Sequence, residues 1–242
     1  MKILVTNDDG YEAVGIRLLA EKMKKFGSVT IVAPHTHMSG ASVSRGGWFQ
    51  SKAYRHADDL YSVEGTPADA VHFAIFGLDL KPDLVVSGIN DGLNIGIDTI
   101  YSGTVGAAME ALKARIPAIA FSCDFGHYGP AEEGFDEVLQ YVFDHDLLSH
   151  NYVLNINFPS KRYLASKGIV VTDIAFRPMH HYYVEGPDGV YKNKRSFLPY
   201  EFVLDTDLWA AEHGYTSITP LKLGNRTYSG LTELRKKVGK IE

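Results

Sequence analysis

Short apolar runs rich in branched side chains recur along the first 160 residues, separated by segments in which apolar residues fall every three or four positions. A strand can be apolar throughout only when both of its faces are covered, so such runs predict the buried strands of a parallel sheet. The runs cover residues 1–6, 29–33, 84–89, 117–123 and 152–158. Strands that alternate with amphipathic helices predict an α/β fold, with a Rossmann-like, mostly parallel sheet flanked by helices.

The helices between these runs have recognisable start and stop signals. Apolar residues recur at helical spacing within 16–26, and Gly27 follows as a stop. Thr66-Pro67-Ala68-Asp69 predicts another helix start, because Thr66 can cap it and Asp69 can return the interaction. Between these two helices, the mixed aromatic and polar pattern of 46–63 favours an antiparallel excursion or a long loop.

The pattern changes after about Lys161, where aromatic residues alternate with polar ones. This alternation predicts strands and hairpins rather than further βαβ units. The expected strands cover 170–174, 182–184, 190–191, 197–203 and 215–219, with a turn at 186–189. Asp205 is expected to cap a short helix, and a basic helix is expected from about Thr232.

These patterns divide the chain into a Rossmann-like core, residues 1–160, and a C-terminal extension, residues 161–242. The extension would hold the hairpins, the final strand of the core sheet and a tail helix. Because a protruding two-stranded ribbon is only marginally stable alone, we expect it to serve oligomerisation by subunit exchange.

Composition narrows the classes of function. The chain has 242 residues, a formal charge of −5 and one cysteine, Cys123. A net negative charge disfavours binding to a nucleic-acid duplex. Because Cys123 is the only cysteine and lies in an apolar run, it is expected to pack as an inert side chain in a protein of a reducing compartment. No apolar run has the length of a signal peptide or a membrane span, so we expect a cytoplasmic protein without membrane contact.

Two carboxylates, Asp8 and Asp9, follow the first apolar run directly. Ligands bind outside the carboxyl ends of strands in open α/β sheets, so both side chains are expected at a ligand crevice. Adjacent anions repel each other unless a cation or solvent separates them, and a hard divalent metal would resolve that conflict. The alternative is that one aspartate caps the next helix and the other is solvated.

Further polar groups follow the other predicted strands. Ser39 lies after the second strand, and Asn90 ends the third. If these strands are neighbours, their ends converge with Asp8 and Asp9 into an all-oxygen set suited to Mg²⁺, Mn²⁺ or Ca²⁺ and unsuited to zinc.

An anion site is expected beside this metal site. Ser102-Gly103-Thr104 opens a predicted helix, and its backbone N–H groups, hydroxyls and helix dipole suit a phosphate, with Asn94 nearby. The alternative is a plain N-cap at Ser102 or Thr104. A metal beside a phosphate cradle is what phosphoryl-transfer chemistry requires.

Several ordered motifs together resemble the stationary-phase survival protein SurE family. They are spread densely over the first half of the chain, with further agreement at 155–159 and 205–221. The main segments are Val5-Thr6-Asn7-Asp8-Asp9-Gly10, Ala33-Pro34 with Ser39-Gly40, Glu64-Gly65-Thr66-Pro67-Ala68-Asp69, Ser87-Gly88-Ile89-Asn90 with Asn94 and Gly96, and Tyr101-Ser102-Gly103-Thr104-Val105-Gly106-Ala107-Ala108.

The resemblance implies a phosphoric monoester hydrolase, a metal-dependent nucleotidase with one divalent ion per subunit. Such enzymes act on nucleoside 5′- or 3′-monophosphates, some also on short polyphosphate, and assemble as homodimers or homotetramers through swapped C-terminal elements. The implied metal ligands are Asp8, Asp9, Ser39 and Asn90, with Asp8 and Asp9 catalytic. Asn94, Ser102, Gly103 and Thr104 are the implied phosphate-binding residues. Met38 and the segment 175–199 depart from the family pattern, so the contacts of the nucleoside part and the subunit geometry do not carry over.

Several mechanistic questions stay open at this level. Asp8 or Asp9 would position or deprotonate an attacking water, with an aspartyl-phosphate intermediate as the alternative. Four histidines, His35, His37, His180 and His181, are candidate general acids, although surface or packing roles are commoner. Two rival functions are a phospho-acceptor receiver module, for which Ser87 stands where the acceptor carboxylate is required, and a non-catalytic nucleotide-binding module.

Overall fold

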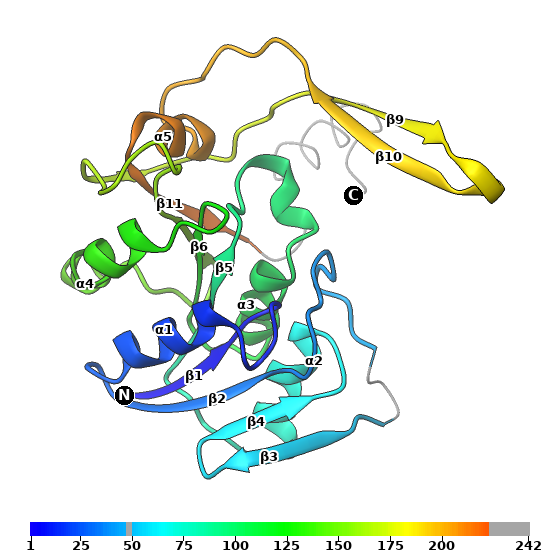
Figure 1. Cartoon of the computed structure of the whole chain (residues 1–242). Helices are drawn as coiled ribbons and strands as arrows, with labels where there is room; N and C mark the ends of the chain where they lie inside the picture. The colour runs from blue at the N-terminus through cyan, green and yellow to red at the C-terminus, as the bar shows by residue number, and fades with distance from the viewer. Residues whose placement is uncertain (47–49, 223–242) are drawn as a thin grey trace, which may run out of the picture.

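A nine-stranded sheet runs through the computed structural model, which describes residues 1–46 and 50–222 (Figure 1). The strand order is β3-β4-β2-β1-β5-β6-β7-β11-β8. The strands are β1 Lys2–Thr6, β2 Ser28–Pro34, β3 Ala53–Ala57, β4 Leu60–Val63, β5 Leu84–Asp91, β6 Ala118–Cys123, β7 Val153–Asn157, β8 Ile169–Val171 and β11 Thr216–Leu221. Parallel pairing joins β4, β2, β1, β5, β6 and β7, whereas β3 and β11 pair antiparallel with β4 and β7. The expected mostly parallel α/β sheet is confirmed.

Helices cover both faces of the sheet. They are α1 Val14–Met23, α2 Pro67–His72, α3 Gly103–Lys113, α4 Gly129–Asp144 and α5 Asp207–His213. Helix α2 continues into a π-helical turn at Phe73–Gly77, and shorter 3₁₀ turns span Gly96–Ile100 and Pro187–Gly189. The capping box at Thr66 and Asp69 is present as predicted, with the Asp69 amide donating to the Thr66 hydroxyl at 3.1 Å.

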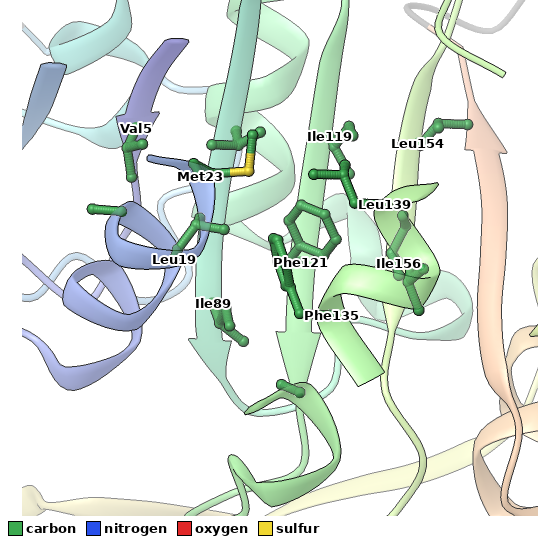
Figure 2. Packing of buried hydrophobic residues seen from close by; sticks show 14 of the residues in the cluster. Val5, Leu19, Met23, Ile89, Ile119, Phe121, Phe135, Leu139, Leu154 and Ile156 are labelled. Atoms are coloured by element: carbon green, nitrogen blue, oxygen red, sulfur yellow. The ribbon is translucent and has the colours of Figure 1, made fainter. Parts of the chain in front are cut away.

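Two hydrophobic cores lie on opposite faces of the sheet. On one face, α1 and α4 pack over the central strands, and Figure 2 shows Leu19 and Met23 of α1 with Phe135 of α4 against Phe121 and Ile119 of β6. On the other face, α2 and α3 bury small side chains against the sheet, including Ala107 and Ala108. Strands covered on both sides explain why the apolar runs of the sequence are continuous.

The free cysteine lies inside the first core. Cys123 is fully buried at the end of β6, and burial raises the pKa of its thiol to about 12. A thiol with such a pKa stays protonated near neutral pH and is a poor nucleophile. Cys123 therefore packs as a small apolar residue, as expected.

The C-terminal part differs from the sequence prediction in two places. The strand expected at 197–203 is absent, because β10 ends at Phe197 and residues 198–203 form no strand. The cap of α5 is Thr206, whose hydroxyl accepts from the Trp209 amide, and not Asp205. In the core, β5 extends two residues beyond the apolar run 84–89 and includes Asn90 and Asp91. The helix expected from Thr232 lies outside the described residues.

A two-stranded hairpin projects from this body. It consists of β9 Met179–Glu185 and β10 Tyr191–Phe197, which pair antiparallel on either side of the turn predicted at 186–189 (Figure 1). All of its residues except Met179 are exposed. In contrast, β8 and β11 of the C-terminal part belong to the main sheet. Within residues 1–46 and 50–222, no helix is both long and apolar enough to span a membrane.

Candidate functional site

The candidate site lies where β1, β2 and β5 end. These three strands are neighbours in register, with Val5 opposite Ile31 of β2 and Thr6 opposite Ser87 of β5. Because the strands are parallel, the loops that follow them emerge from the same edge of the sheet. The predicted adjacency of the three strand ends is therefore present in the fold.

Asp8 is a buried carboxylate held by the start of α3. Its side chain is 4% exposed, and the Thr104 hydroxyl lies 2.5 Å from its Oδ1 and 3.2 Å from Oδ1 of Asn90. Burial raises the pKa of Asp8 above its ordinary value, and the charge of Asp9 adds to the increase, while the Thr104 contact opposes it. Asp8, Asn90 and Thr104, which lie far apart in the sequence, therefore meet at one point.

Asp9 lies beside this cluster and is more accessible. Its side chain is 15% exposed, its Oδ2 accepts from the Asp91 amide at 3.3 Å, and its Oδ1 lies 3.3 Å from Nδ1 of His37. Burial is the main cause that raises the pKa of Asp9, and the neighbouring charge of Asp91 acts in the same direction. Neither aspartate caps α1, since the N-cap is Ala13 and no side chain bonds to the helix start.

The turn that presents both aspartates is fixed by Asn7, a residue that the sequence analysis did not single out. Its amide donates to the Gly10 carbonyl at 2.8 Å, and its Oδ1 accepts from the Gly10 amide at 3.2 Å. Gly10 has a φ of +102°, which side-chain-bearing residues rarely adopt. An asparagine followed three residues later by glycine is the signal for such a turn.

The loop with Ser39 is tied to the same corner through its backbone. The Met38 amide donates to the Asp8 carbonyl at 2.7 Å, and Ser42 donates to the carbonyls of Tyr101 and Ile100. A Cβ on Gly106 of α3 would lie 2.0 Å from the Ser42 carbonyl oxygen, so the loop lies directly on the helix. Ser39 itself is exposed, and no hydrogen bond joins its side chain to Asp8, Asp9 or Asn90 among the described residues.

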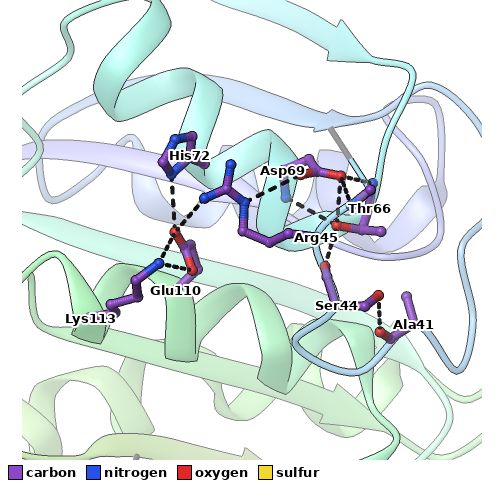
Figure 3. A network of polar contacts seen from close by, with 9 residues as sticks. Ala41, Ser44, Arg45, Thr66, Asp69, His72, Glu110 and Lys113 are labelled. Carbon is purple, nitrogen blue, oxygen red and sulfur yellow. Dashed lines mark hydrogen bonds and ion pairs between the residues drawn. The ribbon is translucent and has the colours of Figure 1, made fainter. Parts of the chain in front are cut away.

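A charged network anchors the far end of this loop (Figure 3). Nε of Arg45 lies 3.4 Å from Asp69 of α2, and its Nη1 lies 3.7 Å from Glu110 of α3. Glu110 is buried and also contacts His72 and Lys113. Buried carboxylates are stable only when paired, so this network holds the loop against both helices. The sequence pattern gave no indication of it, because its members are dispersed along the chain.

The start of α3 has the plain N-cap at Ser102 that was the alternative interpretation of Ser102-Gly103-Thr104. Ser102 is the N-cap, since its hydroxyl accepts from the Val105 amide at 3.1 Å, whereas the Thr104 hydroxyl faces Asp8 and Asn90. A Cβ on Gly103 would lie 2.8 Å from the Asp8 Cβ, so only glycine allows this approach. The positive end of α3 is thus directed at the carboxylates.

Asn94 is anchored by a separate polar network. Its Nδ2 donates to the Ser122 hydroxyl at 2.8 Å, and its backbone carbonyl accepts from the side chains of Asn155 and Asn157. The Asn94 side chain is buried, and none of its described hydrogen bonds reaches Ser102, Gly103 or Thr104. The structure therefore fixes the loop that carries Asn94 without bringing its side chain into contact with the α3 start.

Of the four histidines considered as acids, His37 is the one beside a candidate catalytic carboxylate. His35 contacts the Ser62 hydroxyl at 2.9 Å, and His180 and His181 lie on the exposed hairpin strand β9.

The donors at this corner fit a hard divalent cation. Asp8 and Asp9 supply carboxylate oxygens. The Nδ2 of Asn90 donates to the Gly92 carbonyl at 2.7 Å, so the Oδ1 of Asn90 faces Thr104. No group of three or more His, Cys, Asp or Glu side chains able to hold a metal occurs in the described ranges. A cation here would therefore rely on two carboxylates supplemented by amide and hydroxyl oxygens, as Mg²⁺ with its retained waters does.

The chain is similar to known proteins over nearly its whole length. The model of the family described as survival protein SurE matches residues 3–181. The chain belongs to the SurE family. It is 38% identical over 250 positions to the 5'-nucleotidase SurE of Histophilus somni (strain 2336), and the match covers 98% of both chains. It is 40% identical over 242 positions to the 5'-nucleotidase SurE of Haemophilus influenzae (strain ATCC 51907 / DSM 11121 / KW20 / Rd), and this match covers 97% of this chain and 96% of the relative.

A SurE structure from Aquifex aeolicus has the same fold. It superposes with a TM-score of 0.83 at 34% identity, covering 98% of this chain and 99% of that chain. The resemblance seen in the sequence motifs is thus confirmed, and SurE membership leaves the receiver interpretation without support.

Proposed function

We propose that this chain is a divalent-metal-dependent phosphatase that hydrolyses nucleoside 5′-monophosphates to nucleoside and phosphate. The observation that carries the proposal is the contact of Asp8, Thr104 and Asn90 at the positive end of α3, beside Asp9, in a chain of the SurE family. Relatives named 5'-nucleotidase SurE cover nearly its whole length. Nucleoside 3′-monophosphates and short polyphosphate are further substrates to test.

The residues proposed as ligands of one ion per subunit are Asp8, Asp9, Ser39 and Asn90, with Mg²⁺ or Mn²⁺ favoured over Ca²⁺. When bound, the ion neutralises phosphoryl charge and polarises a phosphoryl oxygen. The proposed phosphate ligands are the backbone amides at Gly103 and Thr104 and the Ser102 hydroxyl at the helix start, together with Asn94. The Thr104 hydroxyl orients Asp8 by donating to it.

We assign the proton transfer to Asp9. It is more accessible than Asp8, and its Oδ1 lies 3.3 Å from Nδ1 of His37. Asp9 accepts a proton from the attacking water, which then displaces the alcohol in line. His37 beside it is the candidate donor to the leaving group. Recovery of a phosphorylated Asp9 peptide from quenched turnover would replace this direct-water route with a covalent one.

The test is phosphate release from a panel of mononucleotides and an aryl phosphate, with Mg²⁺, Mn²⁺, Ca²⁺ or chelator. Asp9→Asn should lower metal-dependent turnover by at least about a thousandfold without changing the circular dichroism spectrum. Asp58→Asn is the matched control, because the Asp58 side chain is 98% exposed on the β3–β4 turn.

Unaltered turnover of Asp9→Asn would refute the assignment of Asp9. Tight nucleotide binding without metal and without phosphate release would favour the non-catalytic binding module. Hydrolysis of the aryl ester alone would indicate a general phosphatase.

We also propose that the functional unit is a homodimer or homotetramer formed through the extension 161–242. The exposed aromatic hairpin β9–β10 supports this proposal, because such a ribbon gains stability from a partner.

A further inference from the structure

A cavity of about 320 Å³ lies between the loop at 93–98 and the base of the hairpin. Leu93 and Ile95, the residues on either side of Asn94, line one wall. The opposite wall includes Arg177, Met179, Arg195 and Phe197. Since consecutive Cα atoms are about 3.8 Å apart, the backbone of Asn94 lies next to two residues that line the cavity.

The hairpin wall offers a stacking surface. Phe197 pairs with Met179 across the base of the hairpin, and the Arg177 guanidinium lies 3.8 Å from the centre of the Phe197 ring. Phe197 is nevertheless 53% exposed. An open aromatic ring beside a stacked arginine is a surface on which planar bases bind with little dependence on sequence.

The same wall carries a buried donor without an acceptor. Nε of Arg177 is buried and has no hydrogen-bond partner among the described residues. Three carboxylates line the cavity: Asp124 accepts from the amides of Phe125 and Lys161, Glu212 pairs with Arg162 at 2.8 Å, and Asp98 on the loop wall is exposed. A buried donor without a partner is unfavourable, so this wall suits a ligand that presents acceptor atoms.

A buried carboxylate fixes the two walls relative to each other. Asp207 at the start of α5 accepts from the Gly96 amide at 2.7 Å and from the amides of Ala175 and Leu208 at 2.8 Å. Gly96 follows Ile95 on the loop wall, and Ala175 precedes Arg177 on the hairpin wall. The hydrogen bonds of Asp207 therefore fix the distance between the loop at 93–98 and the stacking surface at Phe197 and Arg177 within a single chain.

We propose that this cavity binds the nucleoside part of the mononucleotide, with Phe197 stacking on the base and Arg177 and Arg195 donating to its acceptor atoms. The proposal rests on the proposed function and deepens it. It gives the segment 175–199, which departs from the family pattern, the role of setting substrate preference.

The experiment compares Phe197→Ala and Arg177→Ala with the parent on GMP, AMP, UMP and glycerol 2-phosphate, an ester without a base. Loss of binding that is equal in ground and transition states raises KM at constant kcat. We expect KM for the nucleotides to rise about tenfold with kcat within about twofold, from the stacking contribution of one base. Values of kcat/KM for glycerol 2-phosphate should stay unchanged. Tyr191→Ala is the matched control, because Tyr191 is an exposed aromatic residue at the far end of the same hairpin.

Equilibrium binding of guanosine by calorimetry separates this proposal from the proposed function. If the parent hydrolyses none of the esters, the proposed function fails, and guanosine binding that is weakened by Phe197→Ala still supports the cavity. An equal loss of kcat/KM on nucleotides and on glycerol 2-phosphate would overturn the cavity assignment. Values of KM for Phe197→Ala and Arg177→Ala that equal those of Tyr191→Ala would also overturn it. A changed sedimentation coefficient with unchanged guanosine binding would identify the cavity as part of a subunit interface and also overturn it.

Discussion

Two regions of the molecule differ in how their side chains are packed: the corner at the ends of β1, β2 and β5, and the hairpin β9–β10. At the corner, three loops and a helix start are joined by hydrogen bonds, and the central side chains Asp8 and Thr104 are buried. In the hairpin, backbone pairing is complete but nearly every side chain is exposed. The corner is therefore fixed by the chain itself, whereas most of the hairpin side chains have no packing partner within the described parts of the chain.

This difference predicts how substitutions in the two regions should act. The corner depends on tight backbone approaches that permit no extra atoms, so small substitutions there should have large effects. The hairpin presents aromatic residues to solvent, so its substitutions should act mainly on association.

The largest effect is expected from one added methyl group in the corner. Gly106→Ala places a Cβ 2.0 Å from the Ser42 carbonyl oxygen. Alanine favours a helix interior by roughly 1 kcal/mol over glycine, so propensity alone predicts stabilisation. We expect the clash to dominate, with a loss of about 2 kcal/mol or more in the free energy of unfolding and at least a tenfold loss of turnover, measured by urea denaturation and phosphate release.

Gly129→Ala is the matched control for that substitution. Gly129 is the first residue of α4, and a Cβ there would meet no atom within 4 Å. Its stability should change by less than about 0.5 kcal/mol. A Gly106→Ala protein as stable as the parent would show that the Ser42 loop is not held against α3.

A smaller change in the free energy of unfolding, this time a stabilisation, is expected from a substitution at Asp8. Burial raises the pKa of Asp8 in the folded state, so the ionised form disfavours folding at neutral pH, and this cost disappears as pH falls below the ordinary value of 3.8. Asp8→Asn should therefore stabilise the metal-free protein by about 1 kcal/mol at pH 7.5 while activity is lost. Thermal unfolding in chelator at pH 7.5 and pH 4 measures the difference, which should shrink at the lower pH.

Saturating Mg²⁺ should stabilise the parent more than the variant, because a ligand of the folded state raises stability by mass action. Asp58→Asn should show neither effect. An Asp8→Asn protein less stable than the parent in chelator would mean that the Asp8 charge is compensated within the chain.

The smallest effect on folding is expected in the hairpin. Tyr183→Ser removes an exposed ring and should change the free energy of unfolding by less than about 0.5 kcal/mol. If the hairpin forms the subunit interface, dissociation of the oligomer should shift to about tenfold higher protein concentration in sedimentation velocity. Lys194→Ser, on the opposite face of the ribbon, is the control. A parent that is monomeric at every concentration would exclude the interface.

Sequence patterns predicted elements whose signals are local. The buried strands, the stripe of α1 and the capping box at Thr66 each depend on neighbouring residues, and all are present. Strand adjacency then explains why Asp8 and Asn90 meet. The assignment of the cap to Asp205 was wrong by one residue, because Asp205 and Thr206 both have capping side chains and only backbone geometry distinguishes them.

Contacts between distant residues were not predictable in the same way. Arg45 meets Asp69 and Glu110 only after α2 and α3 have packed, and Asp207 reaches Gly96 across 111 positions. Neither contact leaves a periodic signature. The roles of all the proposed site residues stay predictions. The side chains of Ser39 and Asn94 also make no described contact with the carboxylates.

The bond between Asp207 and the Gly96 amide also sets an order of events during protein synthesis. Strands β1, β2 and β5 leave the ribosome within the first 91 residues, and their pairing can begin while the chain is still growing. The loop at 93–98 receives its clamp only when residue 207 has emerged. In a growing chain, both aspartates therefore emerge well before the loop at 93–98 can be held in place by Asp207.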